Sequence, residues 1–352
     1  MSILYILIAI LLLGILVVAH EFGHFMAARL TGIEVMEFAV GFGPKLLNWT
    51  SKKTGTKFSL RAIPLGGFCA FYGEDDATGK SKDDPRAYGK QSVWKRMFTV
   101  LMGPMMNFIL AFVVAVVYVW CTGIADVEPY LMGVDMGGPA QVAGLQAGDV
   151  IAEVNGVNVL DGTFETLLAA IDGPDELTFA VRRNDETLTI LCTPFWDAET
   201  SQYRIGITVG SRYTGTNHPV TLGAAVSQSW DTCVYAGGMI LQAVGALVTR
   251  GEGFEQTSGP VGVVSIVSQE VRAYGLDAFI NLLVVISINL GIMNLLPIPG
   301  LDGSRFLFMV VEAIRRKPVP QEKEAMVHLV GMLFLFSLMI FFTFRDVMNL
   351  FT

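Results

Sequence analysis

The segment His20-Glu-Phe-Gly-His24 has the residue types and the spacing of a metal-dependent hydrolytic site. Histidines four residues apart lie about one turn apart on an α-helix, so both imidazoles leave the same face and can bind one zinc ion. Glu21 lies beside them, and its carboxylate is suited to accept a proton from an attacking water molecule. The pattern therefore predicts a zinc site with Glu21 as its general base.

A hydrolytic zinc ion takes three protein ligands and keeps a fourth position open. Asp302 is the best candidate for the third ligand, in the segment Asn294-Leu-Leu-Pro-Ile-Pro-Gly-Leu-Asp-Gly303 that follows an apolar run. Prolines at positions 297 and 299 break a helix at the point where a ligand has to face inward. They favour a metal ligand over an ordinary Asp-Gly turn residue.

The composition places these residues in a membrane protein. Hydrophobic residues make up 52% of the 352 residues and charged residues only 16%, with a mean hydropathy of +0.53. Globular chains are nearer a quarter charged. The net charge of −8 gives no basic surface for nucleic acid, and the four cysteines form no close pair that would indicate a disulfide framework.

Four runs are predicted to span the bilayer, each close to the length of about 20 apolar residues that a span needs. They are residues 1–28, 97–122, 279–303 and 328–346. The first run has neither a basic start nor a small-residue cleavage site, so we interpret it as a retained span. The run from Val234 to Val248 has only 15 residues, and region 211–278 is interpreted as interfacial or amphipathic.

The distribution of charge predicts the orientation. Lys and Arg are concentrated in segments 29–96 and 304–327, whereas the middle of the chain is acidic. The positive-inside rule puts the two basic segments in the cytoplasm and both termini outside. His20, His24 and Asp302 then approach the cytoplasmic half of the bilayer. A fifth span at residues 234–248 would move Asp302 to the opposite side.

The remaining histidines are weaker ligand candidates. His218 falls in the segment that this topology places outside. His328 opens the last span among charged residues, where a surface histidine at a helix end is the more ordinary interpretation. A His-Glu-His cluster without a function is itself disfavoured at membrane depth, because its burial there is costly.

Two segments are predicted to form strands. Residues 35–71 alternate apolar and polar positions and carry Gly and Pro at turns, as a β-hairpin region on the cytoplasmic side would. Residues 126–210 are predicted to form a compact α+β domain outside the membrane. Its Gly138–Gly156 segment resembles the PDZ pattern of a short helix, a Gly-Asp turn and a strand.

Together these motifs resemble the site-2 protease family of intramembrane zinc metalloproteases, in its bacterial form with one PDZ domain. The matching pieces are the His20–His24 and Asn294–Gly303 motifs, the Gly103–Asn107 and Ser258–Val261 segments, and the turns at residues 41–44 and 64–68. They follow the order of the family along most of the chain. The expected fold class is a polytopic α-helical membrane protein with four transmembrane helices, a membrane-associated β-hairpin region and one extracytoplasmic PDZ-like domain.

The resemblance implies that zinc binds His20, His24 and Asp302, that Glu21 is the catalytic base, and that Asn289 and Asn294 help to hold the substrate strand. It implies cleavage of single-span proteins, such as anti-sigma factors trimmed by an earlier protease, or of remnant signal peptides, in the bacterial cytoplasmic membrane. The expected partners are these substrates and the lipid bilayer.

A transmembrane substrate hides its peptide bonds in helical hydrogen bonds and must be unwound locally before it is cut. An exposed strand edge can pair with the freed backbone groups by β-addition. The strands of residues 35–71 are the candidate for this edge, with an ordinary cytoplasmic hairpin as the alternative. The PDZ-like domain is expected to exclude large substrates or to bind C-terminal peptide ends, unless it is only a steric cap.

Two other functions remain open. A membrane zincin of another class would act on soluble or lipidated tails and would use a glutamate or histidine as its third ligand. A non-proteolytic PDZ scaffold would carry a structural zinc ion, but structural zinc sites are normally closed by four protein ligands, and the sequence offers three.

Overall fold

The computed structural model describes residues 2–74, 84–160, 171, 173–184, 186–198, 202–254 and 257–351. The chain divides into two compact units. A helical unit contains residues 1–119 and 222–352, and a β unit contains residues 120–221.

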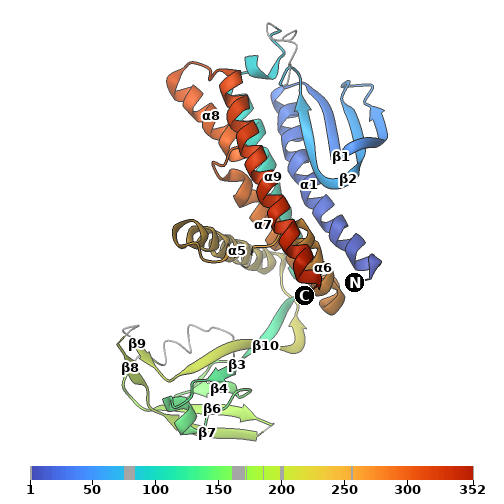
Figure 1. Cartoon of the computed structure of the whole chain (residues 1–352). Helices are drawn as coiled ribbons and strands as arrows, with labels where there is room; N and C mark the ends of the chain where they lie inside the picture. The colour runs from blue at the N-terminus through green and yellow to red at the C-terminus, as the bar shows by residue number, and fades with distance from the viewer. Residues whose placement is uncertain are drawn as a thin grey trace. The chain divides into compact units, whose positions relative to one another are not determined.

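The helical unit is built from long apolar helices (Figure 1). Its helices are α1 (Ile3–Thr31), α2 (Val93–Thr122, whose last residues enter the β unit), α5 (Leu222–Arg250), α6 (Pro260–Tyr274), α7 (Leu276–Leu295), α8 (Asp302–Arg315) and α9 (Gln321–Phe351), with a short 3₁₀ turn η1 at Tyr88–Lys90. Gly32 caps the C-terminal end of α1 in the left-handed conformation (φ 78°) that favours glycine.

The core beside α1 is made by three helices. Ala9, Leu12 and Leu16 of α1 are fully buried and pack against Val267 and Val271 of α6, with Ala278 and Leu283 of α7 in the same cluster. The Ser268 hydroxyl also donates to the Tyr5 carbonyl at 3.2 Å. Because these contacts involve the N-terminal half of α1, its C-terminal half is left to contact α2 and the β-strands.

Five helices within the described residues are long and apolar enough to cross a membrane: α1, α2, α5, α7 and the Lys323–Met348 part of α9. Their apolar side chains are widely exposed in the isolated chain, as lipid-facing residues are. The fifth helix is α5, which lies in the region predicted to be interfacial. The helix includes the Val234–Val248 run and is nearly twice as long, with 29 residues.

The position of α5 differs from that of the other long helices. Cys233, Ala236 and Ile240 pack on α2 and α7 in a cluster with Ala111 and Ile288. Figure 1 shows α5 running across the direction of α1 and α9. Length and composition therefore admit α5 as a span, and its direction differs from that of α1 and α9.

The first two strands, β1 (Val35–Thr50) and β2 (Lys57–Phe71), lie alongside α1 (Figure 1). Each strand bends, at Gly41 (φ 86°) and at Gly66 (φ 93°), so the pair makes a wider sheet than a plain hairpin. Residues 37–40 pair with 57–60 on one side and with 67–70 on the other, and residues 57–60 also pair with 47–50. The edges of this sheet are therefore residues 45–50 and 67–71.

The β unit has a sheet in the order β10-β3-β4-β6-β7, with β5 paired to β4 and a separate pair β8-β9. Its elements are β3 (Ile124–Val134), α3 (Pro139–Ala143), β4 (Val150–Val154), β5 (Val157–Asn158), β6 (Leu177–Arg183), β7 (Glu186–Cys192), β8 (Phe195–Asp197), β9 (Gln202–Arg204) and β10 (Ile207–His218). Its core centres on buried apolar residues such as Leu131, Ile151 and Phe179.

The Gly-Asp turn before β4 is held by a buried carboxylate. Gly148 takes a left-handed conformation (φ 95°), and the Asp149 side chain is 1% exposed. Its oxygens accept hydrogen bonds from the Gln146 amide at 2.9 Å and from the Arg183 guanidinium at 2.6 and 2.7 Å. These hydrogen bonds to Arg183 hold the turn against β6.

The first residues of region 211–278 form a strand of the β unit. Residues 211–218 belong to β10, which pairs with β3 from Ile207 opposite Val134 to His218 opposite Ile124. The β unit consequently extends beyond residue 210 at its C-terminal end. Sequence pattern alone missed this extension because residues 211–218 are exposed and polar, so they lack an apolar alternation.

Candidate metal centre

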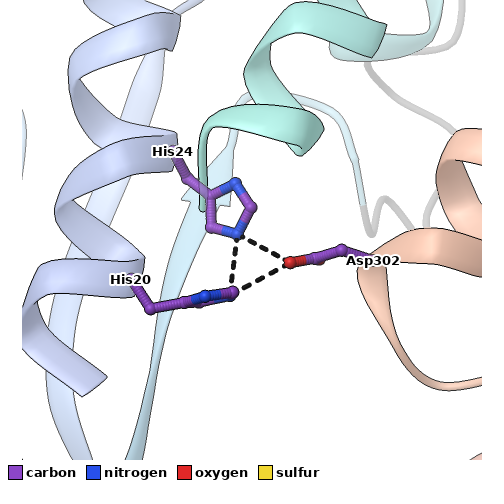
Figure 2. Close-up of side chains that lie close together, drawn as sticks. All are labelled: His20, His24 and Asp302. Carbon is purple, nitrogen blue, oxygen red and sulfur yellow. Dashed lines mark hydrogen bonds and ion pairs between the residues drawn. The ribbon is translucent and has the colours of Figure 1, made fainter. Parts of the chain in front are cut away.

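His20, His24 and Asp302 come together in the helical unit (Figure 2). The two Nε2 atoms are 3.2 Å apart, and the Oδ2 atom of Asp302 lies 3.0 Å from Nε2 of His20 and 3.2 Å from Nε2 of His24. The histidines leave one face of α1, as their spacing predicts, and the carboxylate comes from the first residue of α8.

His24 is oriented by α2. Its Nδ1 donates to the Thr99 carbonyl at 2.8 Å, which leaves the lone pair of Nε2 directed at the cluster. Close approach of the helices requires glycine at two positions. A Cβ on Gly103 would lie 2.2 Å from Nε2 of His24, and a Cβ on Gly23 would lie 2.0 Å from the Met102 carbonyl oxygen.

His20 contacts a buried asparagine on α2. Its Nδ1 lies 3.3 Å from Nδ2 of Asn107, whose Oδ1 has no hydrogen-bond partner among the described residues. When Nε2 serves as a metal ligand, Nδ1 carries the proton and needs an acceptor. A 180° rotation of the Asn107 amide brings Oδ1 to this place, and Ser287 of α7 fixes the backbone by donating to the Asn107 carbonyl at 2.7 Å.

Asp302 is positioned by its backbone. The turn before it contains Gly300 at φ 100°, and the Ser304 hydroxyl donates to the Leu301 carbonyl at 2.8 Å. A Cβ on Gly303 would lie 2.3 Å from the carbonyl oxygens of Leu295 and Leu296, so the residue after Asp302 has to be glycine for α8 to fold back on the end of α7. This explains the Asp-Gly pair of the motif.

Glu21 lies between the metal cluster and the β-sheet. A Cβ on Gly67 of β2 would lie 3.1 Å from Cγ of Glu21, so the edge segment 67–71 runs next to the candidate base. Arg305, one turn after Asp302, donates to the Glu74 carboxylate at 2.6 Å. Glu74 also accepts the Phe71 amide, so the end of β2 is tied to the helix that carries Asp302.

The donor set fits zinc. Ligands about 2.0–2.1 Å from a tetrahedral zinc ion are about 3.3 Å apart, close to the 3.0–3.2 Å separations of the three donor atoms. The Oδ2 atom of Asp302 is buried and has no hydrogen bond of acceptable geometry among the described residues. Three lone pairs facing one another are favourable when a cation lies between them.

The other candidate residues lie elsewhere. Asn294 is half-buried, and its amide donates to the Leu290 carbonyl of its own helix at 3.0 Å. Asn289 is exposed on α7. His218 belongs to the β unit, where its Nδ1 lies 2.7 Å from Asp126. His328 is buried on α9 and accepts a hydrogen bond from Gly300, so the interpretation of a surface histidine is wrong.

Sequence reasoning did not assign roles to Thr99, Asn107 or Arg305. In the sequence, the Gly103–Asn107 segment is distinguished only by its resemblance to the family motif. Thr99 and Asn107 contact histidines 75 and 87 positions away, and Arg305 contacts a residue 231 positions away. Such contacts depend on helix packing and leave no local pattern in the sequence.

Comparison with protein families gives a match over most of the chain. The model of "Peptidase family M50" matches residues 8–338. Among solved structures, the PDZ domain of an SdrC-like protein from Listeria monocytogenes is 22% identical, covers 23% of this chain and 86% of its own, and has a TM-score of 0.21.

Curated relatives match over nearly their whole length. A putative zinc metalloprotease from Clostridium acetobutylicum is 33% identical over 99% of this chain and 98% of its own. The regulator of sigma-W protease RasP from Bacillus subtilis is 33% identical over 97% and 98%, and the zinc metalloprotease RasP from Bacillus licheniformis is 31% identical over 97% and 98%. With three side chains of metal-binding types gathered at one point and a family match from residue 8 to residue 338, the chain belongs to peptidase family M50.

Proposed function

We propose that this membrane metallopeptidase is a zinc-dependent intramembrane endopeptidase, with zinc held by His20, His24 and Asp302. The observation that supports this most directly is the convergence of these three donors, from residues as far as 282 positions apart in the chain, to within 4.8 Å of one another. Relatives named as zinc metalloproteases support zinc as the metal. Bound zinc would supply Lewis-acid polarisation of the scissile carbonyl and of water.

In this proposal, Glu21 accepts the proton of the attacking water and later delivers a proton to the leaving amine. His24 keeps the ligand tautomer through Thr99, and His20 keeps it through Asn107 with the amide rotated so that Oδ1 accepts the Nδ1 proton. Three protein ligands leave a fourth position open, which a catalytic zinc site requires and a structural site lacks.

The substrate strand is proposed to pair with the edge segment 67–71 of β2. This edge lies beside Glu21, whereas the other edge of the sheet, residues 45–50, is separated from it by two inner segments. Pairing satisfies the backbone groups of an unwound substrate at membrane depth. Asn294 and Asn289 are proposed to hold the same strand, and for Asn294 this requires release of its bond to Leu290.

The proposed substrates are single-span membrane proteins, such as pre-trimmed anti-sigma factors, and remnant signal peptides. The printed name of the Bacillus subtilis relative, a regulator of sigma-W protease, supports the first class. The proposed location is the bacterial cytoplasmic membrane, with four spans and the β unit outside. The β unit is proposed to act as a PDZ-like module that excludes large substrates or binds peptide C-termini.

Zinc content and peptidase activity of purified variants test the site. E21Q is expected to bind one zinc ion per chain and to lose cleavage of a single-span reporter, because only the base is removed. D302A is expected to lose both. A D302A protein that keeps zinc would point to a different third ligand, and an E21Q protein that still cleaves would exclude Glu21 as the base.

A further inference from the structure

The turn before Asp302 is held by a side chain from a distant helix. Nδ1 of His328, on α9, accepts the backbone N–H of Gly300 at 3.2 Å, and His328 as a whole is 9% exposed. Its ring packs against Phe308 of α8 in a T-shaped contact with centroids 5.8 Å apart. The imidazole thus joins α9, the turn and α8 at one point.

The neighbouring residues of α9 fit the same turn closely. A Cβ on Gly331 would lie 2.2 Å from the Pro299 carbonyl oxygen, so glycine lets α9 approach the turn. A Cβ on Gly300 would lie 3.2 Å from Leu335 and 3.3 Å from Met332. The Gly300 N–H therefore lies close to α9, where His328 supplies its acceptor.

Asp302 depends on this turn for its position. α8 begins at Asp302, and the preceding residue, Leu301, provides no side-chain cap. The Asp302 carboxylate forms its ion pairs with His20 and His24, so its position relative to them depends on the backbone that carries it. Displacement of Gly300 would therefore move the carboxylate relative to both histidines.

The contact sets the tautomer of the neutral His328 ring. Since Nδ1 accepts a hydrogen bond, the proton of the neutral ring is on Nε2. This Nε2 is buried without a hydrogen-bond partner among the described residues, with Glu324 Oε1 at 3.8 Å. A buried N–H without an acceptor is unfavourable for folding, so Nε2 does not explain why a histidine stands here. The interaction that the imidazole contributes is the hydrogen bond that Nδ1 accepts from Gly300.

We propose that His328 is a positioning residue of the metal centre: by accepting the Gly300 N–H, it fixes the turn that directs Asp302 toward His20 and His24. This inference rests on the proposed role of Asp302 as a zinc ligand. His328 does not touch the ligands, and it acts through two residues of backbone.

Zinc affinity of the full-length protein in detergent tests the inference, with apo-protein titrated against a chromophoric chelator. H328F keeps a ring but offers no acceptor, and it is expected to weaken zinc binding by about tenfold. H328N places Oδ1 near the position of Nδ1 and is expected to restore most of the affinity. H328L repeats the loss of the acceptor in case the phenylalanine does not fit.

Two further variants separate the possible failures. L329A changes the adjacent α9 residue, which is 54% exposed, and should bind zinc as the wild type does. D302N should lose high-affinity binding, and if it does not, the metal site itself is misassigned. If D302N fails to bind but H328F and H328L bind like the wild type, the positioning role is excluded. Equal weakening by H328F and H328N would exclude the hydrogen bond as its cause.

Discussion

At the metal centre, the contact between α1 and α2 leaves no room for a side chain at Gly103. The G103A substitution places a methyl group 2.2 Å from Nε2 of His24, and the imidazole must turn away from the cluster to avoid it. We expect zinc affinity to fall by about tenfold to a hundredfold, as for other changes that misorient a metal-binding histidine.

The matched control for this substitution is G14A. Gly14 also lies within a long helix, but a Cβ there would meet nothing within 4 Å. G14A should leave zinc affinity unchanged and should stabilise α1 slightly, because alanine is the better helix former. Equal zinc affinity in G103A and wild-type protein, measured by chelator competition, would contradict the arrangement of α1 and α2.

The candidate donors of the site can be named from the sequence, whereas the contacts that position them cannot. His20, Glu21 and His24 share one helical turn, so their geometry follows from local spacing alone. Asp302 was inferred from a motif with two prolines, and the structure brings it to the histidines. The roles of Asn107 and His328 could not be inferred, because each depends on which helix faces which.

At the scale of elements, the strand edge beside Glu21 makes a prediction about substrate binding. Along the segment 67–71, backbone N–H groups point alternately toward β1 and away from it. Single proline substitutions at Phe68 and Cys69 therefore remove one N–H of each direction. One of the two prolines removes a backbone N–H that points away from β1, toward the place of the substrate strand. We expect this proline to lower cleavage at least tenfold while zinc stays bound, because the edge no longer donates that hydrogen bond to the substrate.

The opposite edge supplies the control. Prolines at Leu46 and Leu47 remove donors from an exposed edge that is separated from Glu21 by two inner segments, and the one with an outward N–H should leave cleavage unchanged. Loss of cleavage from both edges alike, with zinc retained, would contradict pairing at residues 67–71. Sequence located these strands but not their edges, since the bends at Gly41 and Gly66 decide which segment lies inside.

In the β unit, Glu128 makes stability depend on pH. Burial raises the pKa of its carboxyl, but hydrogen bonds from Arg212 and Arg182 outweigh burial and hold the pKa below the usual value. A depressed pKa stabilises the fold above the unfolded value of about 4.3, and this contribution is lost as the pH falls through the folded pKa.

The E128Q variant should therefore lose about 1–3 kcal/mol of stability in the β unit at neutral pH, because both guanidinium groups lose a charged partner. It should lose little more on acidification, whereas the wild type should weaken below about pH 4.3. Amide hydrogen exchange of β3 and β6, corrected for intrinsic rates, measures both effects. Parallel pH profiles for the two proteins would refute the assignment to Glu128.

At the scale of the whole molecule, composition predicted a membrane protein, and the helices agree in length and apolarity. It could not decide the role of α5. The 15-residue run at positions 234–248 lies inside a helix of 29 residues, which is long enough to cross the bilayer. The direction of α5 relative to the other helices depends on how the helices pack, and a stretch of sequence does not predict this packing.

Cysteine accessibility distinguishes four spans from five. In a cysteine-free background, single cysteines replace Leu222 and Glu252, at the two ends of α5, and Lys53 and Glu176 serve as markers for the two sides. We expect residues 222 and 252 to label from outside together with residue 176, and residue 53 to label only from inside. Labelling of residues 222 and 252 from opposite sides would show that α5 spans the membrane.

The central claim is that Glu21 and the ligand set of His20, His24 and Asp302 cut a peptide bond within a membrane span. The most direct measurement uses wild-type and E21Q protein in liposomes, both shown to hold stoichiometric zinc. Each protein receives a pre-trimmed single-span substrate, and the products are mapped by mass spectrometry. The account predicts a cut inside the span by the wild type and no cut by E21Q. Cleavage only in the soluble tails, or no cleavage by zinc-loaded wild type, would contradict it.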